Sequence, residues 1–81
     1  MTGPAAARHL RKRSFALAGH RTSVALEPPF WDVLEAAARA RGLSLAALVA
    51  EVDAARADLA VPLASALRVF ALGECHRVRQ P

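Results

Sequence analysis

One stretch of eight residues, RTSVALEP at positions 21–28, limits what this chain can fold into more than any other feature. Its side chains alternate in a period of two. One side of the stretch would carry Thr22, Val24 and Leu26. The other side would carry Arg21, Ser23, Ala25 and Glu27. Such alternation predicts a β-strand with one buried face, and two following prolines end it because they supply no backbone N–H.

A strand that is followed directly by helices leaves its backbone edges without partners. A second copy of the chain could supply the missing strand, and a chain of 81 residues gains buried core from dimerisation. Residues 14–17 also alternate, and Gly19 can take the positive φ that a tight turn needs. We therefore favour a hairpin of residues 13–17 against 21–26 over one long strand with a bulge at Gly19.

Three helical segments are expected after the strand. The first runs from about Pro28 to Arg41, with Gly42 placed as its left-handed cap. Its apolar stripe consists of Phe30, Val33, Leu34, Ala37 and Ala38. Trp31 lies off that stripe, and core packing is the preferred interpretation of this residue.

The second helix is expected to open at Ser44, a good N-cap, and to end near Asp58 or Leu59. The third is expected to start at Pro62 and to stop at Gly73. We therefore divide the chain into a flexible basic arm (residues 1–12), a folded domain (13–73) and a flexible tail (74–81). We expect no internal repeat.

The net charge of +4 is unevenly distributed along the sequence. Residues 1–21 carry five basic side chains and no acidic one, whereas acidic residues outnumber basic ones in residues 22–74. This asymmetry indicates an anionic partner, either nucleic acid or a membrane surface, and an organelle presequence is a further alternative. We expect no membrane association, because residues 8–18 form no strongly amphipathic helix and no apolar run reaches the roughly 20 residues of a spanning helix.

The sequence offers no constellation for catalysis. His9, His20 and His76 are scattered, and the adjacent Cys75 and His76 lack the two further ligands of a zinc site. A single cysteine excludes an internal disulfide and fits a reducing cytosol. No glycine-rich phosphate loop is present. We therefore expect no enzyme activity, no cofactor and no metal.

A two-stranded ribbon fits the DNA major groove, where arginine can bond guanine bidentately and serine can bond several base edges. The exposed N–H groups at the start of the second helix would attract an anion such as a phosphate. An ordinary solvated sheet face and an ordinary capping serine are the alternative interpretations of the same residues.

The order of strand, proline, amphipathic helix, GLSL turn (residues 42–45) and second amphipathic helix resembles the ribbon-helix-helix DNA-binding proteins. The stretch AGHRTSVALEPPFWDVLEAAARARGLSLAALVAEVDAAR (residues 18–56) carries the resemblance, which continues into LASALRVFAL (residues 63–72). The resemblance implies a mainly α fold with a short N-terminal β-ribbon, an intertwined homodimer, and here a third C-terminal helix.

The resemblance also implies roles for individual residues. The base-reading residues would be Arg21, Ser23 and Ala25. The phosphate contacts would come from the backbone of Leu43, Ser44 and Leu45. Apart from the resemblance, we expect the basic side chains of Arg11, Lys12 and Arg13 to add a sequence-independent attraction to phosphates. From the apolar pattern we expect the core of such a dimer to contain Thr22, Val24, Leu26, Phe30, Trp31, Leu34, Leu48, Val49 and Val52.

Three features depart from the family pattern. Ala25 offers only a methyl group to a base, Glu27 repels phosphate unless it is turned away, and residues 14–17 would extend or cover the ribbon. The last feature could move the reading surface toward Ser14, Ala16 and the basic run. The leading hypothesis is a homodimeric bacterial transcription regulator in the cytoplasm, associated with the nucleoid and bound to double-stranded DNA. The alternative is a protein-interaction module, antitoxin-like or an accessory subunit, that binds a protein partner through the third helix.

Overall fold

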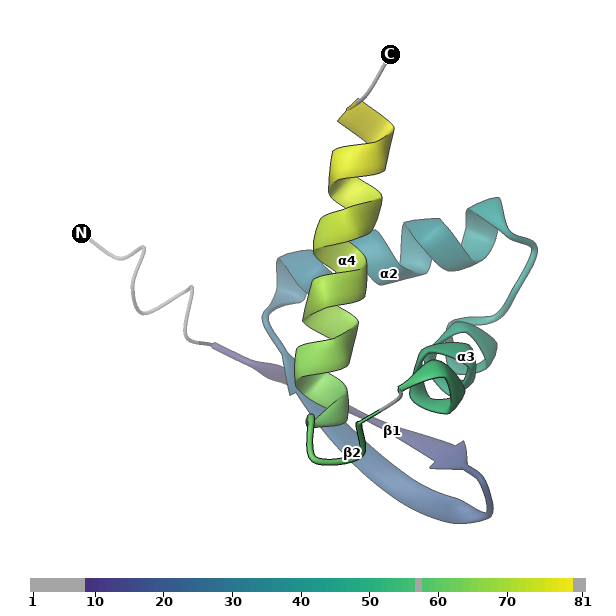
Figure 1. Cartoon of the computed structure of the whole chain (residues 1–81). Coiled ribbons are helices and arrows are strands. Elements are labelled where there is room, and N and C mark those ends of the chain that lie inside the picture. Colours follow the sequence, from purple (N-terminus) through teal and green to yellow (C-terminus); the bar gives the residue numbers. More distant parts are fainter. Residues whose placement is uncertain (1–8, 57, 80–81) are drawn as a thin grey trace.

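The computed structural model describes residues 9–56 and 58–79. A two-stranded antiparallel hairpin is followed by three helices, and all of them pack around one core (Figure 1). The elements in chain order are β1 (Arg11–Leu17), β2 (His20–Leu26), α2 (Pro28–Ala40), α3 (Leu45–Ala55) and α4 (Leu63–Arg79).

The hairpin confirms that the partner strand of residues 21–26 comes from the same chain. β1 pairs with β2 from Arg11↔Leu26 to Leu17↔His20. The connecting residues Ala18 and Gly19 have φ angles of 50° and 82°, and two positive φ values in a two-residue loop match the twist of the flanking strands. A second copy of the chain is therefore not needed to supply hydrogen-bond partners for the edge of β2 that faces β1.

The strand β1 begins at Arg11 rather than at residue 13. The predicted arm of residues 1–12 is therefore wrong in its last two residues, because the backbone of Arg11 and Lys12 is paired with that of Leu26 and Ala25. Residues 1–8 of that arm lie outside the described part of the chain.

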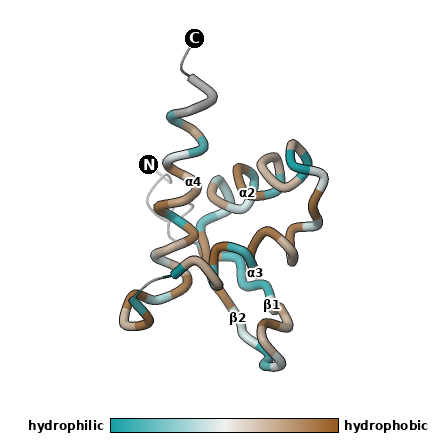
Figure 2. The backbone as a smooth tube through the Cα atoms, turned by 45° about the vertical axis from the view of Figure 1, so that its right-hand side comes forward, coloured by the Kyte–Doolittle hydropathy of each residue, from teal (hydrophilic) through white to brown (hydrophobic). Residues whose placement is uncertain are grey.

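One face of the hairpin forms part of the core. Phe15, Leu17, Val24 and Leu26 are buried, whereas the residues between them are exposed or half-buried. This is the alternation expected of a sheet with one covered face. Figure 2 shows hydrophilic and hydrophobic segments along the hairpin, and β1 is also in contact with α3.

Helix α2 starts with two prolines, whose fixed φ suits the first turn of a helix. It ends in a Schellman motif: the Leu43 N–H donates to the Ala38 carbonyl at 2.8 Å, and Gly42 has a φ of 69°. The predicted glycine cap is confirmed. Trp31 is 1% exposed, which confirms that it packs in the core.

Helix α3 begins as predicted, because the Ser44 hydroxyl accepts a hydrogen bond from the Ala47 N–H at 3.0 Å. It ends at Ala55, so the prediction of an end near Asp58 or Leu59 is wrong. Arg56 takes an extended conformation and its guanidinium donates to Asp53 Oδ1 and to the Val61 carbonyl. These bonds turn the chain toward α4 and leave Leu59 exposed.

Helix α4 runs to Arg79, so the predictions that it stops at Gly73 and that residues 74–81 form a loose tail are wrong for the described residues 74–79. Glycine inside a helix costs only about 1 kcal/mol, which packing and ion pairs can offset. Glu74, the first residue of the predicted tail, forms a bidentate pair with Arg41 at 2.8 and 3.1 Å. This pair joins the second half of α4 to the end of α2.

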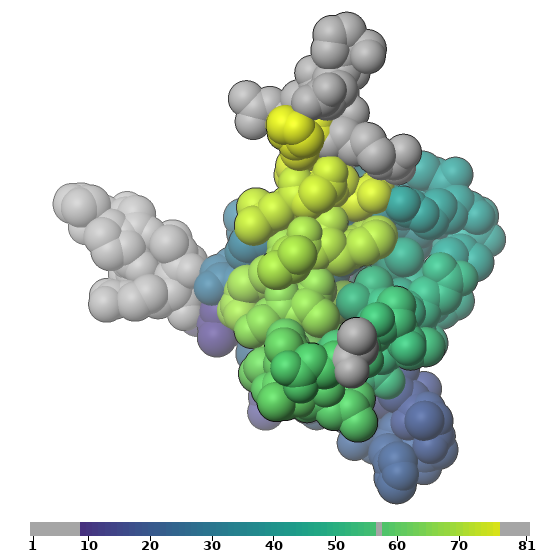
Figure 3. Space-filling view, in the orientation of Figure 1, coloured from purple at the N-terminus to yellow at the C-terminus, as the bar shows by residue number. Residues whose placement is uncertain are grey.

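Helix α4 is an integral part of the core. Leu63, Leu67 and Ala71 are buried together with residues of the hairpin, α2 and α3. In the space-filling view, α4 lies across the front of the molecule and the tip of the hairpin projects beyond the helices at the bottom (Figure 3). The hairpin is therefore held by the helices over part of its length and accessible at its tip.

Candidate nucleic-acid interface

The face of the hairpin that points away from the core carries short polar and basic side chains. Lys12, Ser14 and Ala16 of β1 are exposed, as are Arg21 and Ser23 of β2, and Ala25 is half-buried. We call these six residues the outer face. No residue of either strand is acidic. The predicted base-reading residues Arg21, Ser23 and Ala25 thus lie on one surface.

Two serines occupy the centre of the outer face. Ser14 and Ser23 are register partners, and their Oγ atoms lie 2.9 Å apart in a hydrogen bond. One hydroxyl donates to the other, so one hydroxyl hydrogen and several lone pairs remain for a ligand. The centre of the face therefore offers both a donor and acceptors to a base edge.

The cations of the outer face have no acidic partner within the described chain. The ion pairs within the described residues involve Arg13, Arg41, Arg56 and Arg68, and neither Lys12 nor Arg21 takes part in one. Their charges are therefore available to an anionic ligand.

The basic run of residues 11–13 is divided between the two sides of β1. Arg13 points toward the helices, where it pairs with Glu35 at 2.7 Å and lies over the Trp31 ring at 5.2 Å. Arg11 is exposed, and its carbonyl accepts a hydrogen bond from Trp31 Nε1 at 2.8 Å. Of the three predicted phosphate contacts in this run, Arg13 is thus bound to a carboxylate of its own chain.

Glu27 is held away from the outer face. Its carboxylate accepts a hydrogen bond from Arg68 Nε of α4 at 3.0 Å. A hydrogen bond from its own backbone and the bond from Arg68 lower the pKa of Glu27, so it stays ionised and paired at neutral pH. The pairing with Arg68 therefore keeps the Glu27 carboxylate turned away from a phosphate bound at the outer face, where it would otherwise cause repulsion.

The start of α3 retains part of its predicted anion-binding capacity. The Leu43 N–H is already bonded to the Ala38 carbonyl, so it cannot also bond a phosphate. The N–H groups of Ser44 and Leu45 lie at the start of α3, where a helix provides no carbonyl acceptor for them. The backbone contacts predicted for residues 43–45 are therefore reduced to these two.

The residues predicted to form a dimer core pack within a single chain. Six of them are buried: Val24, Leu26, Trp31, Leu34, Leu48 and Val49. The other three, Thr22, Phe30 and Val52, are half-buried. Their burial is explained by the contacts among the hairpin, α2, α3 and α4, whatever the number of chains in the assembly.

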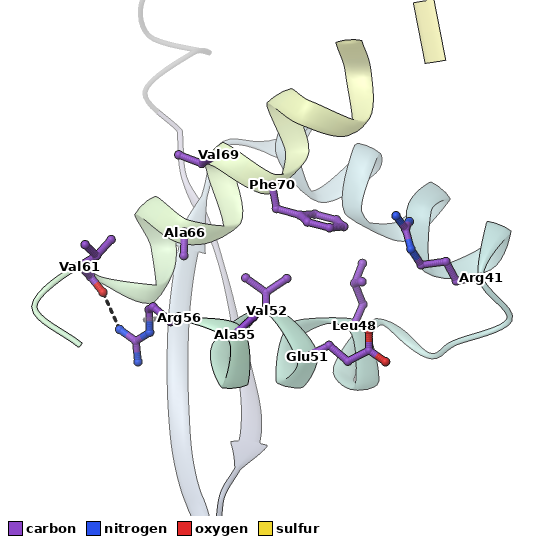
Figure 4. A pocket seen from close by; sticks show the side chains of 10 residues that line it. All are labelled: Arg41, Leu48, Glu51, Val52, Ala55, Arg56, Val61, Ala66, Val69 and Phe70. Atoms are coloured by element: carbon purple, nitrogen blue, oxygen red, sulfur yellow. Dashed lines mark hydrogen bonds between the residues drawn. The ribbon is translucent and has the colours of Figure 1, made fainter. Parts of the chain in front are cut away.

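A hollow of about 480 Å³ lies between α3 and α4, and the sequence did not predict it (Figure 4). Its walls are mainly apolar side chains such as Leu48, Val52 and Phe70, with Arg41 and Glu51 among the polar residues. Within residues 9–56 and 58–79, no three histidine, cysteine or acidic side chains are placed to share a metal ion. The hollow is therefore a mainly apolar groove between two helices, with the charged residues Arg41, Glu51 and Arg56 in its walls.

A short ribbon with a basic outer face, backed by helices, is the architecture of a DNA-binding protein of the ribbon-helix-helix class. A family model described as a ribbon-helix-helix domain matches residues 10–75. The chain belongs to this family, whose fold is a non-enzymatic DNA-binding one. No curated protein and no solved structure matches the chain. None of the helices in the described residues is long and apolar enough to span a bilayer.

Proposed function

We propose that this protein is a bacterial transcription regulator that binds double-stranded DNA as a homodimer, with the outer face of the hairpin in the major groove. The observation that carries the proposal is that face itself: two cations, which form no ion pair within residues 9–56 and 58–79, flank two hydroxyls, and the strands contain no carboxylate. A two-stranded ribbon has the dimensions of the major groove. The homodimer follows from the family, whose members typically dimerise.

Each residue has a defined part in this proposal. Arg21 bonds a guanine bidentately, Ser23 bonds a neighbouring base edge, and Ala25 contacts a thymine methyl group. The exposed side chain of Arg11 and the N–H groups of Ser44 and Leu45 bind phosphates. Arg13 makes no contact with DNA, because Glu35 holds it on the opposite side of β1.

In-vitro selection of bound duplexes from a random pool tests the proposal directly. We expect enrichment of a short common motif. Binding to that motif should weaken with salt, with a slope of log K against log salt concentration of about −5 if Arg11, Lys12 and Arg21 of both chains each release one phosphate equivalent of counterion. A pool that stays random after repeated rounds, with binding indifferent to salt, would refute DNA recognition by this protein.

A second candidate function rests on helix α4. Val69 and Leu72 of this helix are 69% and 59% exposed, and they lie three residues apart on one side of it. Apolar side chains exposed in this way favour a protein partner, as in an antitoxin-like or accessory subunit. Recovery of partners from a bacterial lysate with and without nuclease separates the two functions. Nuclease-resistant, stoichiometric recovery of one protein supports the second candidate.

A further inference from the structure

The two strands of the hairpin are copies of one short pattern. Residues 12–17 read KRSFAL and residues 21–26 read RTSVAL, nine positions later. The matched positions are Lys12 and Arg21, Ser14 and Ser23, Phe15 and Val24, Ala16 and Ala25, and Leu17 and Leu26. Arg13 and Thr22 are the only pair in which the chemical type changes. The expectation of no internal repeat is therefore wrong for the hairpin.

The register of the hairpin turns this repeat into an approximate two-fold symmetry. Two identical strands paired antiparallel are related by a two-fold axis through the point where a residue faces its own copy. Ser14 faces Ser23 in this hairpin. On either side of that point, Lys12 faces Ala25 and Ala16 faces Arg21. The axis therefore passes between the two serine Oγ atoms, which are 2.9 Å apart.

The outer face repeats the same chemistry on both sides of this axis. Each half presents one cation, one hydroxyl and one methyl group, and the two cations lie at opposite ends of the face. The inner side keeps less of the symmetry, since Arg13 pairs with Glu35 while its counterpart Thr22 is half-buried. The resemblance is thus strongest among the side chains that solvent and ligands can reach.

We propose that a single chain carries a complete, pseudo-two-fold DNA-reading face, in which Lys12 and Ser14 contact bases as the counterparts of Arg21 and Ser23. This inference rests on the proposed DNA binding and extends it. The ligand is a segment of double-stranded DNA whose sequence is itself roughly two-fold symmetric. Each chain of a dimer would carry its own ribbon, and no partner strand would be needed to complete it.

Alanine substitutions on the two strands test the equivalence. We expect Lys12→Ala and Arg21→Ala each to weaken binding to the selected duplex by about 10-fold for each chain that contacts it, the usual scale of one lost base contact. Each variant should relax base preference in a different half of the motif. Lys12→Arg should retain binding and make the two halves of the motif more alike.

Arg39→Ala is the matched control, because it removes one exposed positive charge from α2 without touching the hairpin. Its affinity should stay within about 2-fold of the wild type, as expected of a charge outside the contact surface. A motif that depends on Arg21 but is unchanged by Lys12→Ala would overturn the inference and leave the proposed function standing. Failure of the wild-type protein to select any motif would instead refute the proposed function.

A cross-linking experiment tests whether the ribbon is closed within one chain. Ser14→Cys and Ser23→Cys are combined in a Cys75→Ser background, and mild oxidation should join them inside a single chain, because these residues are register partners. The product should run as a monomer on a non-reducing denaturing gel. Disulfide-linked dimers of this variant, or of Ser23→Cys alone, would show that the ribbon is shared between chains and would overturn the inference.

Discussion

Trp31 joins the hairpin to helix α2, and its replacement gives a sharp test of how the ribbon is held. The ring is 1% exposed and packs against Phe15 with ring centroids 5.9 Å apart. Its Nε1 donates to the Arg11 carbonyl at 2.8 Å, and Arg13 lies over its face. One side chain therefore contacts β1 through packing, a hydrogen bond and a cation–π interaction.

The cost of Trp31→Phe follows from these contacts. Loss of the hydrogen bond removes about 1 kcal/mol. Loss of the remaining buried ring atoms removes about 1–2 kcal/mol at roughly 0.8 kcal/mol for each buried carbon group. The expected decrease in the free energy of unfolding is about 2–3 kcal/mol, which corresponds to a decrease in Tm of about 10–20 °C for a domain of this size.

Far-UV circular dichroism during urea unfolding measures this change. It suits the variant because the chain has a single tryptophan, so fluorescence is lost with the substitution. Val69→Ala is the control: its side chain is 69% exposed, and we expect a change of less than about 0.5 kcal/mol. If Trp31→Phe proves as mild as the control, the hairpin is not anchored on α2 in the way described.

Three further predictions concern two glycines and one carboxylate. Gly42→Ala should destabilise the protein by about 1–2 kcal/mol, because alanine is strained at a φ of 69°. Gly73→Ala should stabilise the protein by about 0.5–1 kcal/mol, because this glycine lies inside α4 with open space around it. Thermal unfolding measures the Tm of both glycine variants, and Tm shifts of the same sign would contradict these two predictions. The folded-state pKa of Glu27 lies below its ordinary value of 4.5, so its interactions stabilise the fold at higher pH and are lost as the pH falls through the folded value. Glu27→Gln should therefore lower the urea midpoint at pH 7 and approach the wild type as the pH falls through the folded pKa of Glu27, and a difference that does not shrink on acidification would contradict this account.

Local patterns in the sequence determined the elements and their caps. The alternation in residues 21–26 predicted a strand, the apolar stripes predicted three helices, and Gly42 and Ser44 marked the turn between α2 and α3. These features depend on neighbours a few residues away, which is why the sequence alone reveals them. The alternation also put Arg21, Ser23 and Ala25 on one face of β2, where the structure has them.

Contacts between distant residues determined the rest. The sequence places Arg13 in a basic run, but in the structure it pairs with Glu35, 22 residues away, on the helix side of β1. Glu27 pairs with Arg68, 41 residues away, and this pairing keeps its carboxylate from repelling a phosphate. Helix α4 passes Gly73 because burial of Leu67 and Ala71 and the Arg41–Glu74 pair hold it. The symmetry of the outer face became visible only when the register set Ser14 opposite Ser23. Burial and ion pairing depend on which segments meet in space, and only the tertiary structure brings those segments together.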